Sequence, residues 1–153
     1  MVRVTIPSLS SPRSVSDLGR IYFLAGRYDE ALNTLEGAVS ITAKNPEGLF
    51  YLGRSQMELG RLEKAGETFR TAIQMDKDYL QVYYFLGETD GRLNNMPDAH
   101  YYLGIYYFRK GQYRTARYHL TRARRMLHDP TKLEDVNQAL EVMGPMPKDS
   151  EQR

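Results

Sequence analysis

The stretch YYFLGETDGRLNNMPDAHYYLGIYY, residues 83–107, decides the fold because it contains nearly the same phrase twice. The first copy, YYFLG, ends at Gly87, and the second, HYYLG, ends at Gly104. Leu-Gly pairs also end at Gly19 and Gly53. Successive glycines are therefore 34 residues apart up to Gly87, whereas Gly104 follows after only 17. Self-similarity at a fixed period of this length indicates a repeat architecture. The sequence thus predicts stacked repeats whose fourth copy begins half a period early.

Each 34-residue row contains two helical patterns separated by a turn. In the first row, Leu18, Ile21 and Tyr22 recur at the i, i+3, i+4 spacing that places side chains on one face of a helix. Where the chain must reverse, the rows carry residues suited to a left-handed C-terminal cap, namely Gly26, Gly60, Asn94 and Gly111. The predicted helices span residues 14–26, 28–43, 46–59, 62–76, 79–93, 97–110, 113–127 and 131–143.

Glycines inside the first helix of each row predict close helix packing. Gly19, Gly53 and Gly87 lie within helical patterns, where glycine costs about 1 kcal/mol relative to alanine. The missing side chain offsets this cost if it lets a partner helix approach. We expect small residues of the second helices to supply the opposing surface, namely Ala31, Ala65 and Ala99.

The columns resemble the tetratricopeptide repeat, whose 34-residue pattern is W-x₂-L-G-x₂-Y, then A-x₃-F, then P. The resemblance covers residues 12–130 and rests on Leu18, Gly19, Tyr22, Ala31, Leu52, Gly53, Ala65, Phe69, Ala72, Leu86, Gly87, Ala99 and Leu103. Departures are Val15, Leu49 and Tyr83 in place of Trp, Gln56 and Asp90 in place of Tyr, and a closing Pro displaced to Pro46 and Pro130. The resemblance implies an all-α, right-handed superhelix of antiparallel helix pairs, with the first helix of each pair lining a concave groove.

The segment that carries Gly104 fits two repeat phases at once. Ala99 and Leu103 match the second helix of the third row, while Leu103, Gly104 and Tyr107 begin a fourth row. One hypothesis is that repeat parity inverts here, so that the last helices leave the regular superhelix or close its groove. The alternative is a coincidental Leu-Gly pair in a back helix. We expect a single domain, 1–153, with repeats 12–45, 46–79, 80–96 as a half-repeat or 80–113 overlapping, and 97–130.

The last helix has the pattern of a cap on the repeat stack. Asp129 can cap its start and Pro130 suits its first turn. One stripe is apolar and the opposite side polar, as a terminal solenoid element requires. We therefore expect a capping helix over 131–143 and a polar tail over 144–153.

Composition and motifs do not predict an enzyme. Charged residues at 26% and hydrophobic residues at 41% are typical of a soluble globular chain. There is no Cys, and no H-E-x-x-H, P-loop or G-x-G-x-x-G motif occurs. His100 and His119 have no third ligand at a suitable spacing, so a satisfied or solvent-facing histidine is favoured over a zinc ligand. We expect no catalytic residue, no metal and no cofactor.

The resemblance instead implies recognition of a peptide or partner protein in the groove. Aromatic rings give contact area at low entropic cost, and Arg gives directed hydrogen bonds. Phe50 and Tyr84 fit the core between repeats equally well. The candidate groove residues are Arg13, Arg20, Phe50, Arg54, Gln81, Tyr84, Glu88 and Tyr101.

One tetratricopeptide subclass holds chaperone C-terminal carboxylates with a clamp of Lys, Asn and Arg residues. The corresponding positions here are Ser16, Arg20, Tyr51, Gln81 and Phe85, and only Arg20 is basic. We therefore expect no chaperone-tail carboxylate clamp.

Charge is unevenly distributed along the chain. Residues 99–128 carry seven basic residues and no acid, so the rest has 14 basic and 19 acidic residues, a net charge of 14 − 19 = −5. The candidate basic face consists of Arg114, Arg117, Arg124 and Arg125. Seven cations among tyrosines would suit nucleic acid or an anionic surface. Because the tyrosines recur at helical spacing, they are expected to be packed, and the arginines then form either a solvated convex face or a surface that docks an acidic partner domain. Protein contact is favoured over nucleic acid.

A second, fainter resemblance concerns AHYYLGIYYFRKGQYRTARYHLTRA, residues 99–123. It is similar to the closing repeats of tetratricopeptide domains attached to bacterial membrane-associated zinc metallopeptidases of the BepA-like, CAAX-protease-like kind. This implies a substrate- or partner-docking module of a larger enzyme. No apolar run approaches the roughly 20 residues of a transmembrane helix, and the first residues lack the apolar block of a signal peptide. We expect a cytoplasmic location if the chain is intact, and a periplasmic one if it belongs to a secreted protein.

Overall fold

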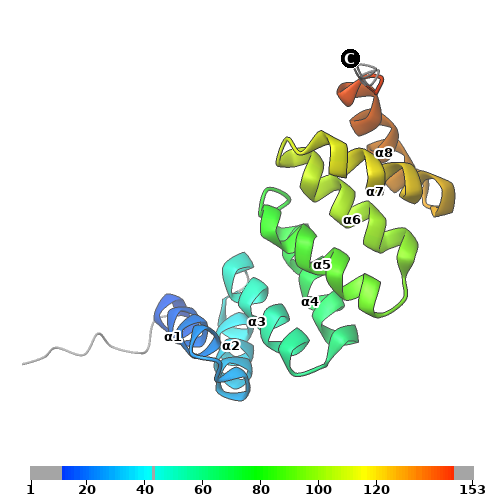
Figure 1. The fold of residues 1–153 in the computed structure, drawn as a ribbon. Coiled ribbons are helices and arrows are strands. Elements are labelled where there is room, and N and C mark those ends of the chain that lie inside the picture. Colours follow the sequence, from blue (N-terminus) through cyan, green and yellow to red (C-terminus); the bar gives the residue numbers. More distant parts are fainter. Residues whose placement is uncertain (1–11, 43, 147–153) are drawn as a thin grey trace, which may run out of the picture.

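Eight helices and no strands make up the part of the chain that the computed structural model describes, residues 12–42 and 44–146. Figure 1 shows them stacked in chain order from α1 to α8. Every predicted boundary lies within two residues of the observed one. The helices are α1 (Pro12–Leu24), α2 (Tyr28–Ile41), α3 (Pro46–Glu58), α4 (Leu62–Met75), α5 (Leu80–Arg92), α6 (Met96–Arg109), α7 (Tyr113–Met126) and α8 (Pro130–Met143).

Two kinds of connection join the helices: tight turns with a left-handed residue, and extended links. The α6–α7 connection is a tight turn. After α1, Gly26 adopts φ +73°, and the amide of Arg27 donates to the carbonyl of Tyr22 at 2.9 Å, as in a Schellman cap. Gly60, Asn94 and Gly111 also have positive φ angles, so the predicted left-handed caps are confirmed. The α2, α4 and α7 helices instead end in extended residues, Thr42, Asp76 and Leu127. Two tight turns therefore follow one another, on either side of α6.

The helix glycines mark the closest approaches between consecutive helices. A Cβ on Gly19 would lie 2.4 Å from Leu35, and one on Gly53 would lie 2.5 Å from Phe69. The expectation of small opposing residues is corrected here, because each glycine receives a large side chain from 16 positions further along the chain. The same relation joins Gly87 to Leu103 and Gly104 to Leu120. The missing side chain thus accommodates a bulky residue.

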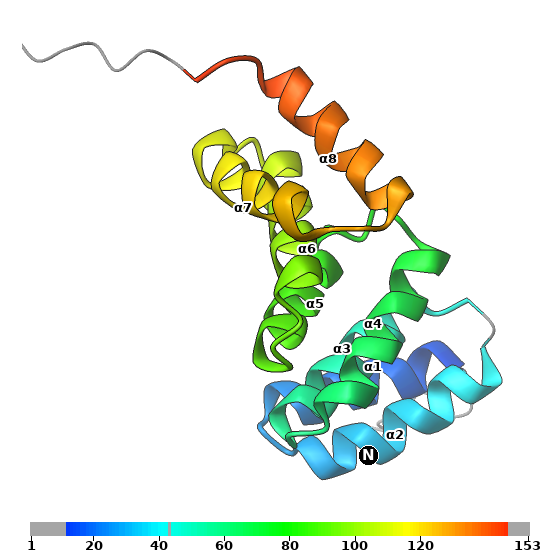
Figure 2. The same cartoon turned by 90° about the vertical axis from the view of Figure 1, so that its right-hand side faces the viewer.

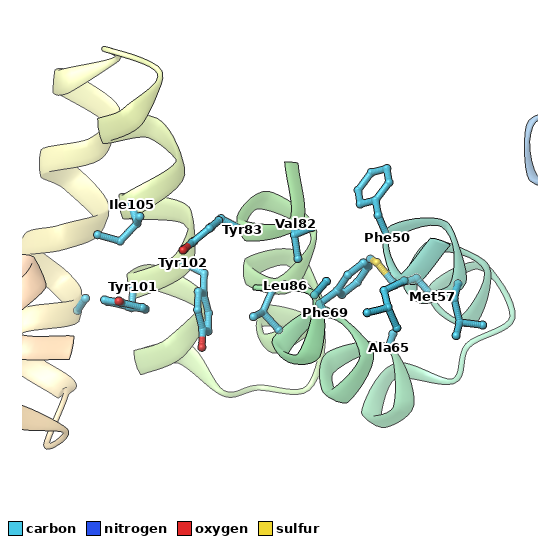
Figure 3. Close-up of a cluster of buried hydrophobic side chains, with 14 of the residues drawn as sticks. Phe50, Met57, Ala65, Phe69, Val82, Tyr83, Leu86, Tyr101, Tyr102 and Ile105 are labelled. Atoms are coloured by element: carbon cyan, nitrogen blue, oxygen red, sulfur yellow. The ribbon is translucent and has the colours of Figure 1, made fainter. Parts of the chain in front are cut away.

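Helix α6 is packed on three sides, and a different stripe of residues serves each side. Leu103 approaches Gly87 of α5, while Gly104 approaches Leu120 of α7. A third stripe, which includes Tyr101 and Ile105, is buried away from both of these contacts. Contacts on three sides explain why aromatic and aliphatic residues are not confined to one face of α6. Figure 3 shows the core running from Phe50 and Phe69 through Val82 and Leu86 to Tyr102 and Ile105.

Helix α8 crosses the α6–α7 end of the stack (Figure 2). The side chain of Asp129 accepts hydrogen bonds from the amides of Thr131 and Lys132, so its predicted capping role is confirmed. Two polar contacts tie α8 to α6. Lys132 pairs with Asp98 at 2.7 Å, and the Tyr101 hydroxyl donates to Asp135 at 2.6 Å.

The packing supports a proposal for how the repeats divide. We propose that α1–α2, α3–α4 and α5–α6 form three pairs, and that α6 also acts as the first helix of a pair with α7. Helix α8 then stands where the first helix of a further repeat would stand. This division corresponds to the overlapping phases of the sequence, 80–113 and 97–130.

Candidate functional site

The predicted groove residues fall into an exposed set and a buried set. Arg20, Gln81 and Glu88 are accessible on α1 and α5. Phe50 is 6% exposed and belongs to the core, which is the alternative that the sequence left open. Arg13 lies in α1, but its side chain is outside the described part of the chain. We name the surface formed by Arg20, Arg54, Gln81, Tyr84 and Glu88 the α1–α3–α5 face.

Arg54 is the centre of the α1–α3–α5 face. Its guanidinium carbon lies 3.8 Å from the ring centroid of Phe85, 4.9 Å from that of Phe23 and 6.0 Å from that of Phe50. One ring thus comes from each of α1, α3 and α5. The three rings meet at Arg54 because α1, α3 and α5, the first helices of successive repeats, stack side by side. The result is a cation held by aromatic rings, an interaction that strengthens with desolvation.

The polar contacts of Arg54 leave its donors available. The nearest acid is Glu58, at 3.9 Å, which is too long for a hydrogen bond. Within the described residues, the guanidinium makes no other ion pair and no hydrogen bond. Burial lowers the pKa of Arg54, against the opposing effect of Glu58. A partly desolvated cation with free N–H groups is therefore exposed to an incoming ligand.

Residues near Arg54 add further polar groups and aromatic rings to the α1–α3–α5 face. The Nε atom of Arg20 is buried and has no hydrogen-bond partner among the described residues. Burial, followed by the charge of Glu47, raises the pKa of Tyr79 to about 12, so its hydroxyl stays protonated and can donate. Tyr84 is half-buried against Tyr106, with ring centroids 5.2 Å apart. The face combines aromatic area with hydrogen-bond donors.

Tyr101 does not reach this face. It is 8% exposed and donates its hydroxyl to Asp135 of α8. It lines a separate cavity of about 550 Å³ between α4, α5, α6 and α8. The assignment of Tyr101 to the same groove as Arg54 is therefore corrected: the stripe of α6 that carries Tyr101 faces α8.

Of the four predicted basic-face residues, three are exposed and one contacts α8. Arg114, Arg124 and Arg125 are exposed on α7. Arg117 instead donates to the carbonyls of Met143 and Gly144 at the end of α8. A cation at this end of a helix is favourable because the carbonyls carry partial negative charge. Arg117 is thus engaged in holding α8.

His100 of α6 and His119 of α7 face each other across the tight pair. Their Nδ1 atoms are 2.9 Å apart, and the His119 ring stacks on Tyr107 with an interplanar angle of 10°. No group of three His, Cys, Asp or Glu side chains suited to a metal occurs within the residues described. The pair joins two helices, with one ring nitrogen donating to the other.

This pair predicts a loss of stability on acidification. Burial, then His100 and Arg122, lower the pKa of His119 to about 4, and burial followed by Arg122 lowers the pKa of His100. In the unfolded chain both pKa values are near 6.5. As the pH falls below 6.5, the unfolded state therefore binds protons that the folded state does not. We expect the free energy of unfolding in urea to be about 1 kcal/mol lower at pH 5.0 than at pH 7.5 on account of His119, after allowing for its partial exposure.

The control for this effect is His119→Gln, whose free energy of unfolding is measured at pH 7.5 and at pH 5.0. The variant should lose part of the acid-induced decrease, whatever its stability at pH 7.5. An identical decrease in wild type and variant would contradict the assignment.

Sequence reasoning missed two features of the site. It did not predict that the rings of Phe23 and Phe85 contact Arg54. The 34-residue period, which places the first helices of successive repeats side by side, could have indicated this contact. It also missed the cavity under α8. No helix of the described chain is both long and apolar enough to cross a bilayer.

The stacked helix pairs with their recurrent glycine contacts define an all-α helical repeat solenoid. Residues 22–88 match the family model of the tetratricopeptide repeat. This part of the chain belongs to the tetratricopeptide repeat family. No curated protein sequence matches it at a significant level.

Solved structures with the same fold include several tetratricopeptide domains. The Arabidopsis OM64 TPR domain is 16% identical with a TM-score of 0.66, and the match covers 79% of this chain and all of that domain. The second TPR domain of human RPAP3 is 15% identical over 83% of this chain and 98% of that one, with a TM-score of 0.63. The Yersinia enterocolitica type III secretion chaperone SycD is 15% identical over 90% and 96%, with a TM-score of 0.59.

Proposed function

We propose that the chain is a non-catalytic interaction scaffold that binds a peptide, or an extended segment of a partner protein, on the α1–α3–α5 face. The observation that carries this proposal is Arg54, a half-buried cation held over three phenylalanine rings, with N–H groups that no described side chain engages. A ligand carboxylate or carbonyl would accept from these donors. Charge-assisted bonds of this kind are stronger than neutral ones.

The surroundings of Arg54 fit a binding hot spot. Arg and aromatic residues dominate the energetics of interfaces when they lie in a partly desolvated centre. Arg20, whose side chain is 42% exposed, adds a second cation, while Gln81 and Glu88 form a polar margin. Such a margin gives orientation and excludes water. The face is therefore suited to an acidic or carbonyl-rich segment with apolar side chains.

Two of the similar structures are complexes with peptides. The SycD structure contains a peptide of the translocator YopD, and the RPAP3 domain is bound to the HSP70 peptide SGPTIEEVD. These ligands belong to those proteins. They support peptide binding as a use of this fold. At the chaperone-clamp positions of this chain, Phe85 packs on Phe50 and Phe69, and Ser16 accepts a hydrogen bond from Asn45. An EEVD-type tail is therefore not the ligand that we propose.

A second candidate use is docking to an acidic surface through α7, as in a module attached to a larger metallopeptidase. The observation that favours it is the pair of exposed tyrosines, Tyr113 and Tyr118, among exposed arginines. Arg122 stacks on Tyr118 with its guanidinium carbon 3.6 Å from the ring centroid. The capture experiment below separates this use from binding on the α1–α3–α5 face.

Substitution of Arg54 or Arg20 by alanine should weaken partner binding without loss of helicity. Wild type, Arg20→Ala, Arg54→Ala and the matched α7 control Arg125→Ala are immobilised and exposed to an extract of the cells that express the protein. Quantitative mass spectrometry then compares the bound proteins. We expect one partner to be retained by wild type and Arg125→Ala and reduced about tenfold by Arg54→Ala.

Two checks make this result decisive. Circular dichroism must show equal helicity in all variants, and the purified partner must reproduce the ranking by direct titration. Loss of the partner with Arg125→Ala, and not with Arg54→Ala, would instead support docking through α7. A ranking in which no variant differs from wild type would overturn the proposal.

A further inference from the structure

The cavity beneath α8 is a second recess, distinct from the α1–α3–α5 face. It has a volume of about 550 Å³, within the range of ligand sites. Its walls come from the end of α4, from α5, and above all from α6 and α8. On α5 it is lined by Tyr83, whereas Tyr84, the next residue, belongs to the α1–α3–α5 face. The two surfaces therefore use different sides of α5.

Helix α6 explains why this recess exists. Its residues Tyr101, Ile105 and Phe108 line the cavity, at the i, i+4, i+7 spacing of one helical stripe. In a regular stack this side of a second helix would form the back. Because α6 is also paired with α7, α8 stacks against this side and encloses it. The Lys132–Asp98 and Tyr101–Asp135 contacts fix the position of α8. The recess is consequently formed without a ligand.

The lining is largely apolar and aromatic. Tyr83, Tyr102 and Ile105 are buried and form its floor. Ile73 and Phe108 are half-buried at its edge. Val142 of α8 is 70% exposed, an unusual position for an apolar side chain beside a recess. An apolar ligand group would cover the exposed parts of these side chains.

The charges at the cavity leave a positive side. Asp129 is used as the cap of α8, and Asp135 accepts from Tyr101. On the opposite wall, Arg109 stacks on Tyr83 at 4.7 Å and donates to the carbonyl of Lys77. Neither Arg109 nor Lys77 forms an ion pair with an acid in the described residues. The two acids thus keep their charge beside α8, whereas Lys77 and Arg109 place two cations at the other edge of the cavity.

We propose that this cavity is a second peptide-docking site, which takes a short segment with apolar side chains next to an Asp, a Glu or a terminal carboxylate. The apolar side chains enter between α6 and α8, and the carboxylate lies against Lys77 and Arg109. This site is independent of the binding proposed for the α1–α3–α5 face, so one chain can bridge two partners.

The probe is a phage-displayed library of random peptides, selected on wild-type protein with counter-selection on the double variant Lys77→Glu/Val142→Lys. Both side chains are exposed, so the variant should keep the fold, which circular dichroism and thermal unfolding verify. We expect recovered peptides to be rich in apolar residues adjoining an acid. They should bind the double variant about tenfold more weakly than wild type. Arg54→Ala and Arg125→Glu serve as matched controls and should bind the peptides as wild type does.

Three results would overturn the proposal. The first is that no recovered peptide distinguishes wild type from the double variant. The second is that the peptides depend on Arg54 and so bind the other face. In the third, sedimentation shows that the wild type self-associates and the double variant does not, because the occupant would then be a second copy of this chain.

Discussion

Gly104→Ala should lower the free energy of unfolding by about 1–3 kcal/mol, although alanine is intrinsically the better helix former. A Cβ at this position would lie 2.4 Å from Cδ2 and 2.7 Å from Cγ of Leu120, and 3.2 Å from its backbone nitrogen. Leu120 is fully buried, so its side chain has little room to move. The backbone contact means that α6 and α7 must separate. Urea denaturation monitored by circular dichroism measures the effect.

Gly37→Ala is the matched control. Gly37 also lies within a helix, α2, but a Cβ there would meet no atom within 4 Å. Its replacement should raise the free energy of unfolding by about 0.5–1 kcal/mol through helix propensity alone. The two alanines should therefore shift stability in opposite directions. Stabilisation by Gly104→Ala would contradict the close α6–α7 packing.

Arg70→Met should cost about 2–4 kcal/mol of stability because it leaves a buried carboxylate unpaired. Asp90 of α5 is 1% exposed, and its Oδ1 accepts from Arg70 of α4 at 2.7 Å. The Oδ2 atom has no hydrogen-bond partner among the described residues. Because Arg70 itself is 38% exposed, water can partly replace it, which places the expected loss toward the lower end for a buried pair. Thermal and urea unfolding both report the change.

A double variant separates the lost charge pair from lost packing. Adding Asp90→Asn to Arg70→Met removes the unpaired charge and should recover most of the stability. The control Arg27→Ala, at the exposed Arg27–Glu30 pair, should leave the unfolding midpoint unchanged. If Asp90→Asn restores nothing, the loss comes from the packing of the Arg70 side chain and the ion-pair explanation is wrong.

The fold could be predicted from the sequence because its signals are local. The caps at Gly26, Gly60, Asn94 and Gly111 each need a left-handed residue, and each lies at a helix end that the periodicity already indicated. The repeated Leu-Gly pairs likewise located close helix contacts. The alanines expected to oppose these glycines are not their partners, because each glycine receives a bulky side chain from 16 positions further along the chain. Leu35 and Phe69, rather than the neighbouring alanines, point at the glycines.

The binding face was only partly predictable. Arg54 could be placed by the resemblance, but its contacts with Phe23 and Phe85 require three helices to stack, which no local pattern specifies. Tyr101 occupies the column expected of a groove residue, but its hydroxyl donates to Asp135, so this side of α6 faces α8. The position of α8 depends on contacts such as Lys132–Asp98, made between residues 34 apart in sequence.

Asp90 shows a departure from the family pattern that has a structural role. It stands where the tetratricopeptide pattern usually has Tyr, and Gln56 occupies the same column one repeat earlier. Gln56 is also buried and accepts a hydrogen bond from the Thr68 hydroxyl at 2.8 Å. Both polar residues therefore contact side chains of α4, which lies between α3 and α5. The Gln56–Thr68 bond lies within one repeat, whereas the Arg70–Asp90 pair joins two repeats.

The central claim is that the α1–α3–α5 face, with Arg54 at its centre, is where a partner binds. Hydrogen–deuterium exchange of the protein, alone and saturated with the partner lost by Arg54→Ala, tests it most directly. We predict slower exchange on binding in α1, α3 and α5, in the segments around Arg20, Arg54 and Tyr84, and unchanged exchange in α7. Protection confined to α7, with α3 and α5 unaffected, would contradict the claim.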